Sequence, residues 1–495
     1  MQAGTTALCP RCGIDSVIPL DRGMDVAFLR RMRAHWFCGG TLATGCGGRS
    51  LRRPASGPLD IRTDCRYVHA HLSWGKATMR TLLAALVLSS FCATPVISQG
   101  QSAIEMGQQH VLRSSVMDEN REILVTVPES YARTTIGYPV LFLLDGSSHI
   151  LHATATTRTL AAARNRAPEM IVVAVPNTSG NRNRDLTPGA GAERFERFFG
   201  EELIPWVDST YRTVPERIIM GHSLGGSFVT HALLNRPELF DVYIAASAPL
   251  WRYDSLAHDM RQGLQRAAKA NVALYLTIGE EEWSQLRGGV ERFAEALTAT
   301  AADMVPNWSF VDLPGEDHSS TSQKTLYSSL ETHYASYRFP YFEVQAELDS
   351  LGGLRAIEDH FARASSRFGY PVHPPERVLE AVASVYVVEG KHAETMELAV
   401  AYKTAYSAWA EALINRTGYD LLQRGDVEQA IAAFKRNTML FSDSPNTYDS
   451  LADGYCRAGD EEAARKSMLQ AVAAAEERSH PRVEIYRTRA GQPCR

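Results

Sequence analysis

The sequence predicts an α/β protein with a mostly parallel sheet, covered by helices on both faces and followed by a wholly helical region. From about residue 109 to residue 313, strand-like apolar runs alternate with helix-like stretches. Residues 140–144 and 171–175 are almost continuously apolar, as strands buried on both faces are. Past residue 340 the apolar residues follow only helical periodicity.

The expected strands are apolar, rich in β-branched residues and bounded by turn-forming residues. They comprise a hairpin at residues 109–116 and 121–127, and then residues 138–144, 170–175, 217–220, 241–246, 272–278 and 308–313. Helix-like stretches lie near residues 150–163, 192–208, 224–235, 255–268 and 283–303. Reactive residues of such sheets gather at the carboxyl ends of the strands, so the loops after the strands are the place to look for a site.

The 495 residues divide into segments of different character. The expected order is an upstream segment that is disordered or belongs to an overextended gene model (1–78), a signal peptide (79–98), the sheet-bearing domain (99–340), a helical linker (341–375), helical repeats (376–480) and a tail (481–495).

The segment 79–98 resembles a secretory signal. The segment begins with Met79 and a basic residue and continues with about ten apolar residues. It ends in small residues that suit cleavage after Ser98. The apolar stretch is shorter than the roughly 20 residues that a bilayer span needs, so we expect no integral membrane span. Cys92 follows the bulky Phe91, which disfavours a lipoprotein signal. We therefore expect translation to begin at Met79 and the protein to be periplasmic or secreted.

Charge is distributed unevenly along the chain. Residues 1–78 have a net charge of +6, whereas residues 99–495 carry 39 basic and 51 acidic side chains, a net charge of −12. An acidic body disfavours nucleic acid and anionic membranes as partners, because both select clustered Lys and Arg. A small-molecule substrate remains compatible with this balance, and the sequence does not indicate an oligomeric state.

Five of the eight cysteines lie in residues 1–78. Four of them could be drawn as a zinc knuckle, namely Cys9, Cys12, Cys38 and Cys46. The long gap between Cys12 and Cys38 disfavours a zinc site. Without residues 1–98 only Cys456 and Cys494 remain, which allows one disulfide, and that part of the chain implies no metal or organic cofactor.

Residues 217–226 predict a nucleophile elbow. An apolar β-run leads into Gly-His-Ser-Leu-Gly and then into a helix-like stretch, the strand–turn–helix setting that a G-x-S-x-G motif requires. The sharp turn exposes the hydroxyl of Ser223 and faces it with a helix N-terminus, which activates a poor nucleophile. Gly221 and Gly225 suit this turn because larger side chains would collide there. Ser223 is the candidate nucleophile, and His222 is interpreted as structural.

His318 is the candidate general base. It lies in a turn-rich segment after the last expected strand, from which a side chain can reach back over the sheet edge to Ser223. Most other histidines after residue 98 fall within helix-like runs.

A third residue should orient the imidazole and stabilise its charged form. Three adjacent carboxylates, Glu280, Glu281 and Glu282, follow the strand at 272–278, so the chain order is Ser, acid, His, as in an α/β-hydrolase. Glu282 is preferred and Glu281 comes next. Asp317 or Glu316 could act instead, and a Ser–His dyad is conceivable.

The oxyanion formed at the attacked carbonyl requires backbone N–H donors. One is expected from Leu224, directly after the nucleophile. The other is expected from the loop after the strand at 138–144, at Gly146 or Ser147, where the glycine permits close backbone approach.

The C-terminal region shows a period of 34 residues. Gly425 and Gly459 are separated by this distance, and Leu421 with Tyr455 repeats it. A weaker unit lies around Gly390. The period, with glycine at a helix turn, resembles the tetratricopeptide repeat, the alternative being an unrelated helical bundle.

Five spaced motifs together resemble the "Putative esterase" family of α/β-hydrolases, which includes esterase D-like enzymes, siderophore esterases and feruloyl esterases. They are Leu-Leu-Asp-Gly-Ser at 143–147, Arg-Asn-Arg-Asp-Leu-Thr-Pro at 182–188, Glu-Glu-Leu-Ile-Pro-Trp at 201–206, the elbow at 221–226 and Gly-Glu-Asp-His at 315–318. The resemblance covers about residues 105–335 and implies carboxylic-ester hydrolysis through an acyl-enzyme. It also implies that the segment around Arg184 and Asp185 fixes a loop over the site. Siderophore-esterase members can act with a weak or absent third residue, which leaves the role of Glu282 open.

The leading interpretation is a periplasmic or secreted serine carboxylic-ester hydrolase that acts on a small-molecule ester. One alternative is a protein-interaction module in which the helical repeats bind a protein or peptide and the hydrolase domain is a scaffold. Another is an acyltransferase or a peptidase that uses the same three residues.

Overall fold

The computed structural model describes residues 105–162, 165–253, 257–300 and 307–494. The expectations for residues 1–98, including the signal peptide and the zinc alternative, therefore lie outside the described residues. The expected domain boundaries at 340, 375 and 480 stay predictions.

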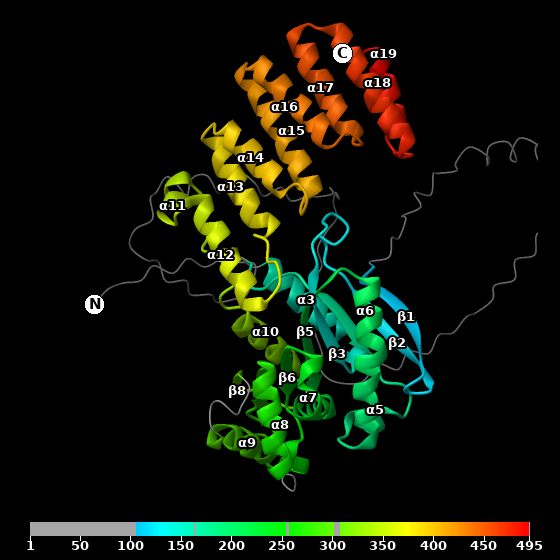
Figure 1. The fold of residues 1–495 in the computed structure, drawn as a ribbon, viewed down its shortest axis with the longest axis vertical. Coiled ribbons are helices and arrows are strands. Elements are labelled where there is room, and N and C mark those ends of the chain that lie inside the picture. Colours follow the sequence, from blue (N-terminus) through cyan, green and yellow to red (C-terminus); the bar gives the residue numbers. More distant parts are fainter. Residues whose placement is uncertain (1–104, 163–164, 254–256, 301–306, 495) are drawn as a thin grey trace, which may run out of the picture. The chain divides into compact units, whose positions relative to one another are not determined.

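The described residues contain an eight-stranded sheet in the order β1-β2-β4-β3-β5-β6-β7-β8 (Figure 1). The strands are β1 (Gln108–Ser114), β2 (Glu119–Thr126), β3 (Tyr138–Leu144), β4 (Ile171–Val175), β5 (Thr213–His222), β6 (Val242–Ala246), β7 (Ala273–Gly279) and β8 (Asn307–Leu313). Two pairings are antiparallel, β1–β2 and β2–β4, and the other five are parallel. The α/β class and all eight expected strands are confirmed.

Helices follow most of the strands. They are α3 (Gly146–Ala162), α4 (Arg182–Leu186), α5 (Ala190–Phe198), α6 (Ile204–Thr210), α7 (Leu224–Asn235), α8 (Ala257–Ala270), α9 (Ser284–Ala299) and α10 (Thr321–His333). The single helix expected at 192–208 is interrupted by a π-helical turn at Phe199–Leu203, after which Pro205 lies in the first turn of α6. Neither α4 nor α10 is among the helices expected from the sequence. In α10 the buried face carries hydroxyl side chains such as Thr325, which bonds Thr277 of β7 at 2.6 Å, so apolar periodicity is weak there.

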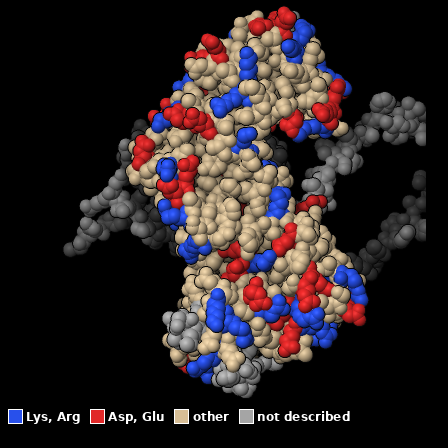
Figure 2. Space-filling model, in the orientation of Figure 1, with Lys and Arg blue, Asp and Glu red and all other residues tan. Residues whose placement is uncertain are grey.

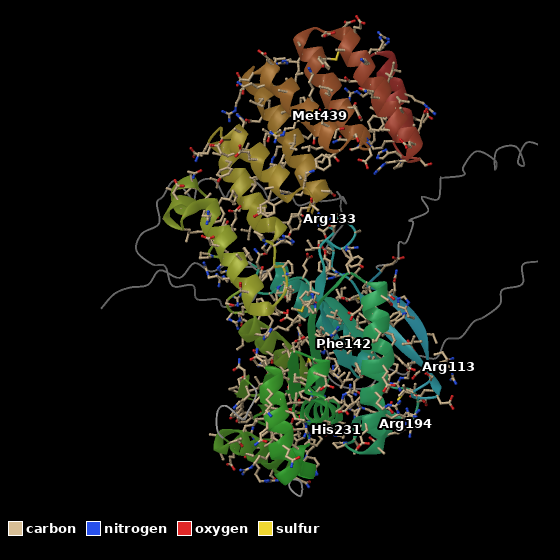
Figure 3. The ribbon with its side chains drawn as sticks, in the orientation of Figure 1. Arg113, Arg133, Phe142, Arg194, His231 and Met439 are labelled. Atoms are coloured by element: carbon tan, nitrogen blue, oxygen red, sulfur yellow. A yellow bond between two sulfur atoms is a disulfide. The ribbon has the colours of Figure 1, made fainter. Side chains whose placement is uncertain are left out.

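Two hydrophobic cores lie on the two faces of the sheet. Alternate residues of β3 separate between them, with Leu141 and Leu143 in one core and Phe142 and Leu144 in the other. The core that contains Phe142, labelled in Figure 3, also holds the aromatic side chains of α5 and α7. The other core continues through α10 into the C-terminal helices as far as Leu451.

Glu216 of β5 joins the sheet to the helical region. Its buried carboxylate accepts hydrogen bonds from the hydroxyls of Tyr334 and Tyr370, at 2.7 and 2.5 Å, and pairs with Nε2 of His333 at 2.8 Å. Burial and the charge of Glu216 raise the pKa of Tyr334. Three side chains, all bound to the carboxylate of Glu216, thus hold one end of β5 against the segments that follow the sheet.

The C-terminal region of the described chain consists of helices, most of which pack against the next helix along the chain (Figure 1). They are α11 (Gln345–Ser350), α12 (Gly353–Phe368), α13 (Glu376–Val388), α14 (His392–Tyr402), α15 (Ser407–Arg424), α16 (Val427–Leu440), α17 (Pro445–Ala458), α18 (Glu461–Glu477) and α19 (Val483–Gly491). Gly390, Gly425 and Gly459 follow α13, α15 and α17 with φ of 70°, 90° and 78°. This left-handed conformation favours glycine, which explains why glycine recurs at the period seen in the sequence. The expected helical character is confirmed, whereas assignment to the tetratricopeptide repeat stays a prediction.

Cys456 and Cys494 form a disulfide with a Cα–Cα distance of 5.2 Å. The pairing that the sequence allows is therefore present, and it attaches the residues after α19 to α17.

Charged side chains of both signs are interspersed over the face seen in Figure 2. Within the described ranges, no helix combines the length and the apolar character that crossing a membrane would take.

Glu196 of α5 and His231 of α7 form a buried titratable pair between these two helices. His231, labelled in Figure 3, places Nε2 3.6 Å from Oε1 of Glu196, which is a buried oxygen without a hydrogen-bond partner among the described residues. Burial raises the pKa of Glu196 to about 8 and lowers the pKa of His231 to about 4.

Glu196 is expected to make the protein less stable as pH rises. A carboxyl whose pKa is raised by folding contributes stability at low pH that is lost as pH passes through about 8. Between pH 6 and pH 9 this loss should be about 2–3 kcal/mol, and Glu196→Gln should remove it. Urea unfolding at both pH values measures the difference. Glu193→Gln, on the exposed side of the same helix, is the matched control, and an unchanged pH dependence in Glu196→Gln would contradict the prediction.

Candidate functional site

Ser223 lies at a sharp turn between β5 and α7. Its φ of 57° and ψ of −124° are strained for a residue with a side chain, as expected for a nucleophile elbow. A Cβ at Gly221 would lie 2.2 Å from the carbonyl carbon and oxygen of Gly225, so only glycine fits there. The backbone N–H of Ser223 donates to the carbonyl of Ala246 at the end of β6, 2.9 Å away, which fixes the turn to the neighbouring strand.

His318 reaches Ser223 from the loop between β8 and α10. Its Nε2 lies 3.0 Å from Oγ of Ser223, a hydrogen-bond distance. Asp317 Oδ1 accepts the N–H groups of Ser319 and Ser320, at 2.8 and 3.0 Å, which folds the loop tightly around the histidine. Asp317 is thus engaged with its own loop rather than with the imidazole.

Glu282 is the carboxylate that the structure brings to His318. Its Oε1 lies 2.9 Å from Nδ1 of His318, and its side chain has an exposed fraction of 0%. The neighbouring carboxylates are placed differently: Glu281 is exposed, and Glu280 accepts the N–H of Gly315 at 2.8 Å. Glu316 pairs with Lys324. Of the five acidic side chains considered from the sequence, Glu282 is the one that contacts the imidazole of His318.

His222 supports the histidine loop from inside the elbow. Its Nε2 donates to the backbone carbonyl of His318 at 2.6 Å, and the two imidazole centroids are 4.7 Å apart. Burial, aided by the nearby His318, lowers the pKa of His222 to about 4. A neutral His222 would not repel a positive charge that forms on His318. This arrangement agrees with the structural interpretation of His222.

The expected oxyanion donors lie at two neighbouring helix N-termini. Leu224 opens α7, whereas Gly146 and Ser147 open α3 directly after β3, the strand that pairs with β5. A Cβ built at Gly225 would lie 3.2 Å from Oδ2 of Asp145, so the two turns are adjacent. The positive ends of both helix dipoles therefore face the same region.

Asp145 is a residue that the sequence motifs contained without indicating its contacts. It has a φ of 51° and is buried, and Arg182 of α4 holds its carboxylate with bonds of 2.6 and 2.9 Å to Oδ1 and Oδ2. Burial alone would raise the pKa of Asp145, but Arg182 and Asn177 outweigh it and the pKa is lowered. This ion pair fixes the turn that carries Gly146.

With Ser223 as the expected nucleophile and Gly146 as an expected oxyanion donor, we expect Arg182→Gln to lower kcat for a short ester by about 10- to 100-fold, because the turn with Gly146 would lose its anchor. KM should change less than kcat, since the expected donor acts on the transition state. Steady-state kinetics on a short ester measure both constants. The exposed Arg194 on α5, labelled in Figure 3, provides the control Arg194→Gln, and a rise in KM with unchanged kcat would contradict this role of Arg182.

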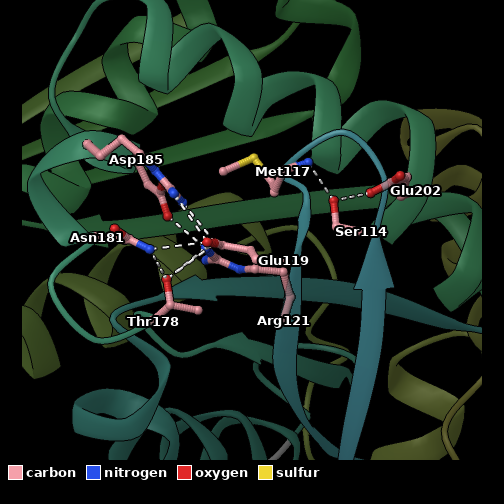
Figure 4. Close-up of polar contacts among 9 residues, drawn as sticks. Ser114, Met117, Glu119, Arg121, Thr178, Asn181, Asp185 and Glu202 are labelled. Carbon is pink, nitrogen blue, oxygen red and sulfur yellow. Dashed lines mark hydrogen bonds and ion pairs between the residues drawn. The ribbon is translucent and has the colours of Figure 1, made fainter.

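Arg184 and Asp185, implied to fix a loop, form ion pairs with residues of the antiparallel hairpin, and Figure 4 shows Asp185 beside Glu119 and Arg121. Asp185 pairs with Arg121 of β2 at 2.7 Å, and both side chains are 1% exposed. Glu119 joins the network through Arg121 and Arg184, each at 2.8 Å, and Arg184 lowers its pKa to about 2. The network holds α4, and with it Arg182, against β2.

The Glu201–Trp206 motif also acts on the hairpin. Glu202 Oε1 accepts the backbone N–H groups of Ser115 and Val116, at 2.8 and 3.1 Å, and its other oxygen bonds the hydroxyl of Ser114 (Figure 4). The motif therefore stabilises the turn between β1 and β2.

A cavity lies away from the cluster formed by Ser223, His318 and Glu282. A cavity of about 540 Å³ lies at the amino ends of β3 and β5, where its lining includes Tyr138, Thr213 and Tyr406, and no residue of the cluster lines it. Within the described residues, His, Cys, Asp and Glu side chains form no group of three or more arranged to hold a metal ion.

Comparisons with known proteins agree with the fold and the sequence motifs. The family described as "Putative esterase" matches residues 114–325. The ferri-bacillibactin esterase BesA of Bacillus subtilis is 30% identical, in an alignment that covers 42% of this chain and 82% of BesA. A siderophore enterobactin esterase of Emericella nidulans is 32% identical over 30% of this chain and 60% of that protein, so the chain spans less than two thirds of this relative.

A crystal structure of an IroE-like serine hydrolase from Shewanella oneidensis superposes with a TM-score of 0.48 at 24% identity, covering 62% of this chain and 99% of that chain. The sequence matches support an ester hydrolase activity. By its similarity to BesA and its match to the family, this chain is a member of the "Putative esterase" family of α/β-hydrolases.

Proposed function

We propose that the protein is a serine carboxylic-ester hydrolase that acts through an acyl-enzyme, with Ser223 as nucleophile, His318 as base and Glu282 as the orienting acid. The observation that carries the proposal is the continuous hydrogen-bonded series from Glu282 Oε1 to His318 Nδ1 and from His318 Nε2 to Ser223 Oγ, at 2.9 and 3.0 Å. This is the relation that nucleophilic catalysis by serine requires.

In the first half-reaction Ser223 Oγ attacks the ester carbonyl while His318 Nε2 accepts its proton. The carbonyl oxygen becomes an oxyanion, for which the N–H groups of Leu224 and of Gly146 or Ser147 are the proposed donors. His318 then gives its proton to the leaving alcohol oxygen, the ester C–O bond breaks, and the acyl group stays on Ser223. Glu282 stabilises the imidazolium throughout.

In the second half-reaction water replaces the alcohol. His318 takes a proton from the water, the resulting hydroxide attacks the acyl carbon, and Ser223 recovers its proton as the carboxylic acid leaves. The carboxylate of Glu282 is suited to this role because its side chain is fully buried and faces Nδ1 of His318.

A fluorophosphonate probe tests the proposal, because it phosphonylates an activated serine. Mass spectrometry is expected to place the adduct on Ser223, and the labelled protein should lose turnover of p-nitrophenyl acetate. Folded protein that neither labels nor hydrolyses this ester would overturn the proposal. The names of the relatives make siderophore esters the first natural substrates to compare with simple esters.

We also propose that the protein is exported. The signal-like segment at 79–98 supports this, as does the disulfide between Cys456 and Cys494, because disulfides persist in oxidising compartments. The N-terminus of the native protein, read by mass spectrometry, is expected to follow Ser98. Peptides from upstream of Met79 would contradict this start.

A further inference from the structure

Trp283 is a large apolar side chain that stays half exposed beside the proposed catalytic residues. Its exposed fraction is 49%, whereas the side chain of the preceding Glu282 is fully buried. The turn after β7 therefore buries the side chain of Glu282 against His318 and leaves the side chain of Trp283 half exposed to solvent. An exposed indole gains free energy when an apolar group covers it, which makes this side chain a candidate contact for substrate.

The indole is held against the imidazole of His318. The two ring centroids are 4.7 Å apart and the ring planes are inclined by 50°. The backbone of Trp283 is fixed because its carbonyl accepts the N–H groups of Leu286 and Arg287, at 3.0 and 3.1 Å, in the first turn of α9. The indole thus occupies a defined position next to the group that transfers the proton.

The direction of the reaction assigns this position to one side of the ester. The carbonyl oxygen must point toward the donors at Leu224 and Gly146, and the leaving oxygen must point toward Nε2 of His318, which protonates it. The group carried by the alcohol therefore leaves past His318, where Trp283 lies. The acyl group does not need to approach this ring.

We propose that Trp283 binds a flat aromatic group on the alcohol side of the ester and so determines leaving-group specificity. This inference rests on the proposed function. An indole offers a planar face to a second ring, and such pairs add selectivity beyond simple apolar burial. The substrate class is therefore an ester whose alcohol carries an aromatic ring.

Three acetate or methyl esters separate the two sides of the substrate: benzyl acetate carries the ring on the alcohol, methyl phenylacetate carries it on the acyl group, and ethyl acetate carries none. We expect Trp283→Ala to lower kcat/KM for benzyl acetate by about 10-fold. The other two esters should change by less than about twofold. Trp283→Phe, which keeps a flat ring, should recover most of the benzyl acetate activity.

Fluorophosphonate labelling of Ser223 in each variant reports whether the reactive serine is intact. Tyr341→Ala, at an exposed aromatic side chain between α10 and α11, is the matched control and should leave all three esters unchanged. An equal loss with all three esters, or a loss confined to methyl phenylacetate, would overturn the role of Trp283 while leaving ester hydrolysis standing. Wild-type protein that neither labels nor hydrolyses any ester would instead overturn the proposed function.

Discussion

Ser223→Ala is expected to lower kcat for p-nitrophenyl acetate by about 10⁴- to 10⁶-fold, because the only group positioned to form the acyl-enzyme in the proposed mechanism is removed. The oxyanion donors and the binding surface remain, so a small residual rate above that in buffer is expected. Measuring single-turnover kinetics with excess enzyme separates this residual from slow product release.

Alanine is a mild change at this position sterically, yet the strained φ of 57° remains, so folding should be checked alongside activity. Near-ultraviolet circular dichroism and the midpoint of urea unfolding serve this purpose. Ser209→Ala, at an exposed serine on α6, provides a matched control that should retain full activity. Retention of turnover by Ser223→Ala in a preparation free of other esterases would show that another group is the nucleophile.

Glu282→Gln is expected to lower kcat by about 10²- to 10⁴-fold with a much smaller change in KM. Glutamine preserves the size of the side chain but removes the charge that stabilises the imidazolium. Its amide can also favour the wrong tautomer of His318. Because Glu282 is fully buried, the change acts on a carboxylate that solvent does not screen.

The two neighbouring carboxylates make the comparison stringent. Glu281→Gln and Glu280→Gln change the same residue type within the same loop, and both are expected to stay within about threefold of wild type. Their side chains are exposed, and Glu280 faces Gly315 instead of the imidazole. Equal activity of Glu282→Gln and wild type would indicate that a Ser–His dyad suffices.

The sequence predicts the strands and the approach of His318 to Ser223 well, because both depend on local patterns and on chain order. Apolar runs of β-branched residues allow little besides buried strands, and loops after parallel strands meet at one edge of the sheet. The catalytic roles remain a proposal, but the contacts between Ser223, His318 and Glu282 are as the sequence suggests.

Other features depend on contacts between distant segments, which local patterns do not contain. The contact of Glu282 with His318 depends on which side chain the turn after β7 directs inward. The ion pair of Asp145 with Arg182 joins the turn after β3 to α4, and the two residues are 37 positions apart in sequence. The helix α10 has buried hydroxyls whose partners lie on the sheet, so apolar periodicity could not reveal it.

The contacts of Glu216 connect the helical region to β5, the strand that leads into the nucleophile elbow. Glu216 lies on β5, the strand that leads into Ser223, and its partners Tyr334 and Tyr370 belong to the segments that follow the sheet. The proposed nucleophile follows the carboxyl end of β5, whereas Tyr334 and, from the helical region, Tyr370 hold the amino-terminal part of the same strand. Removing the helices after residue 340 would take Tyr370 from Glu216 and expose to water apolar residues of the core that the two regions share, so the hydrolase domain should not be regarded as a detachable enzyme.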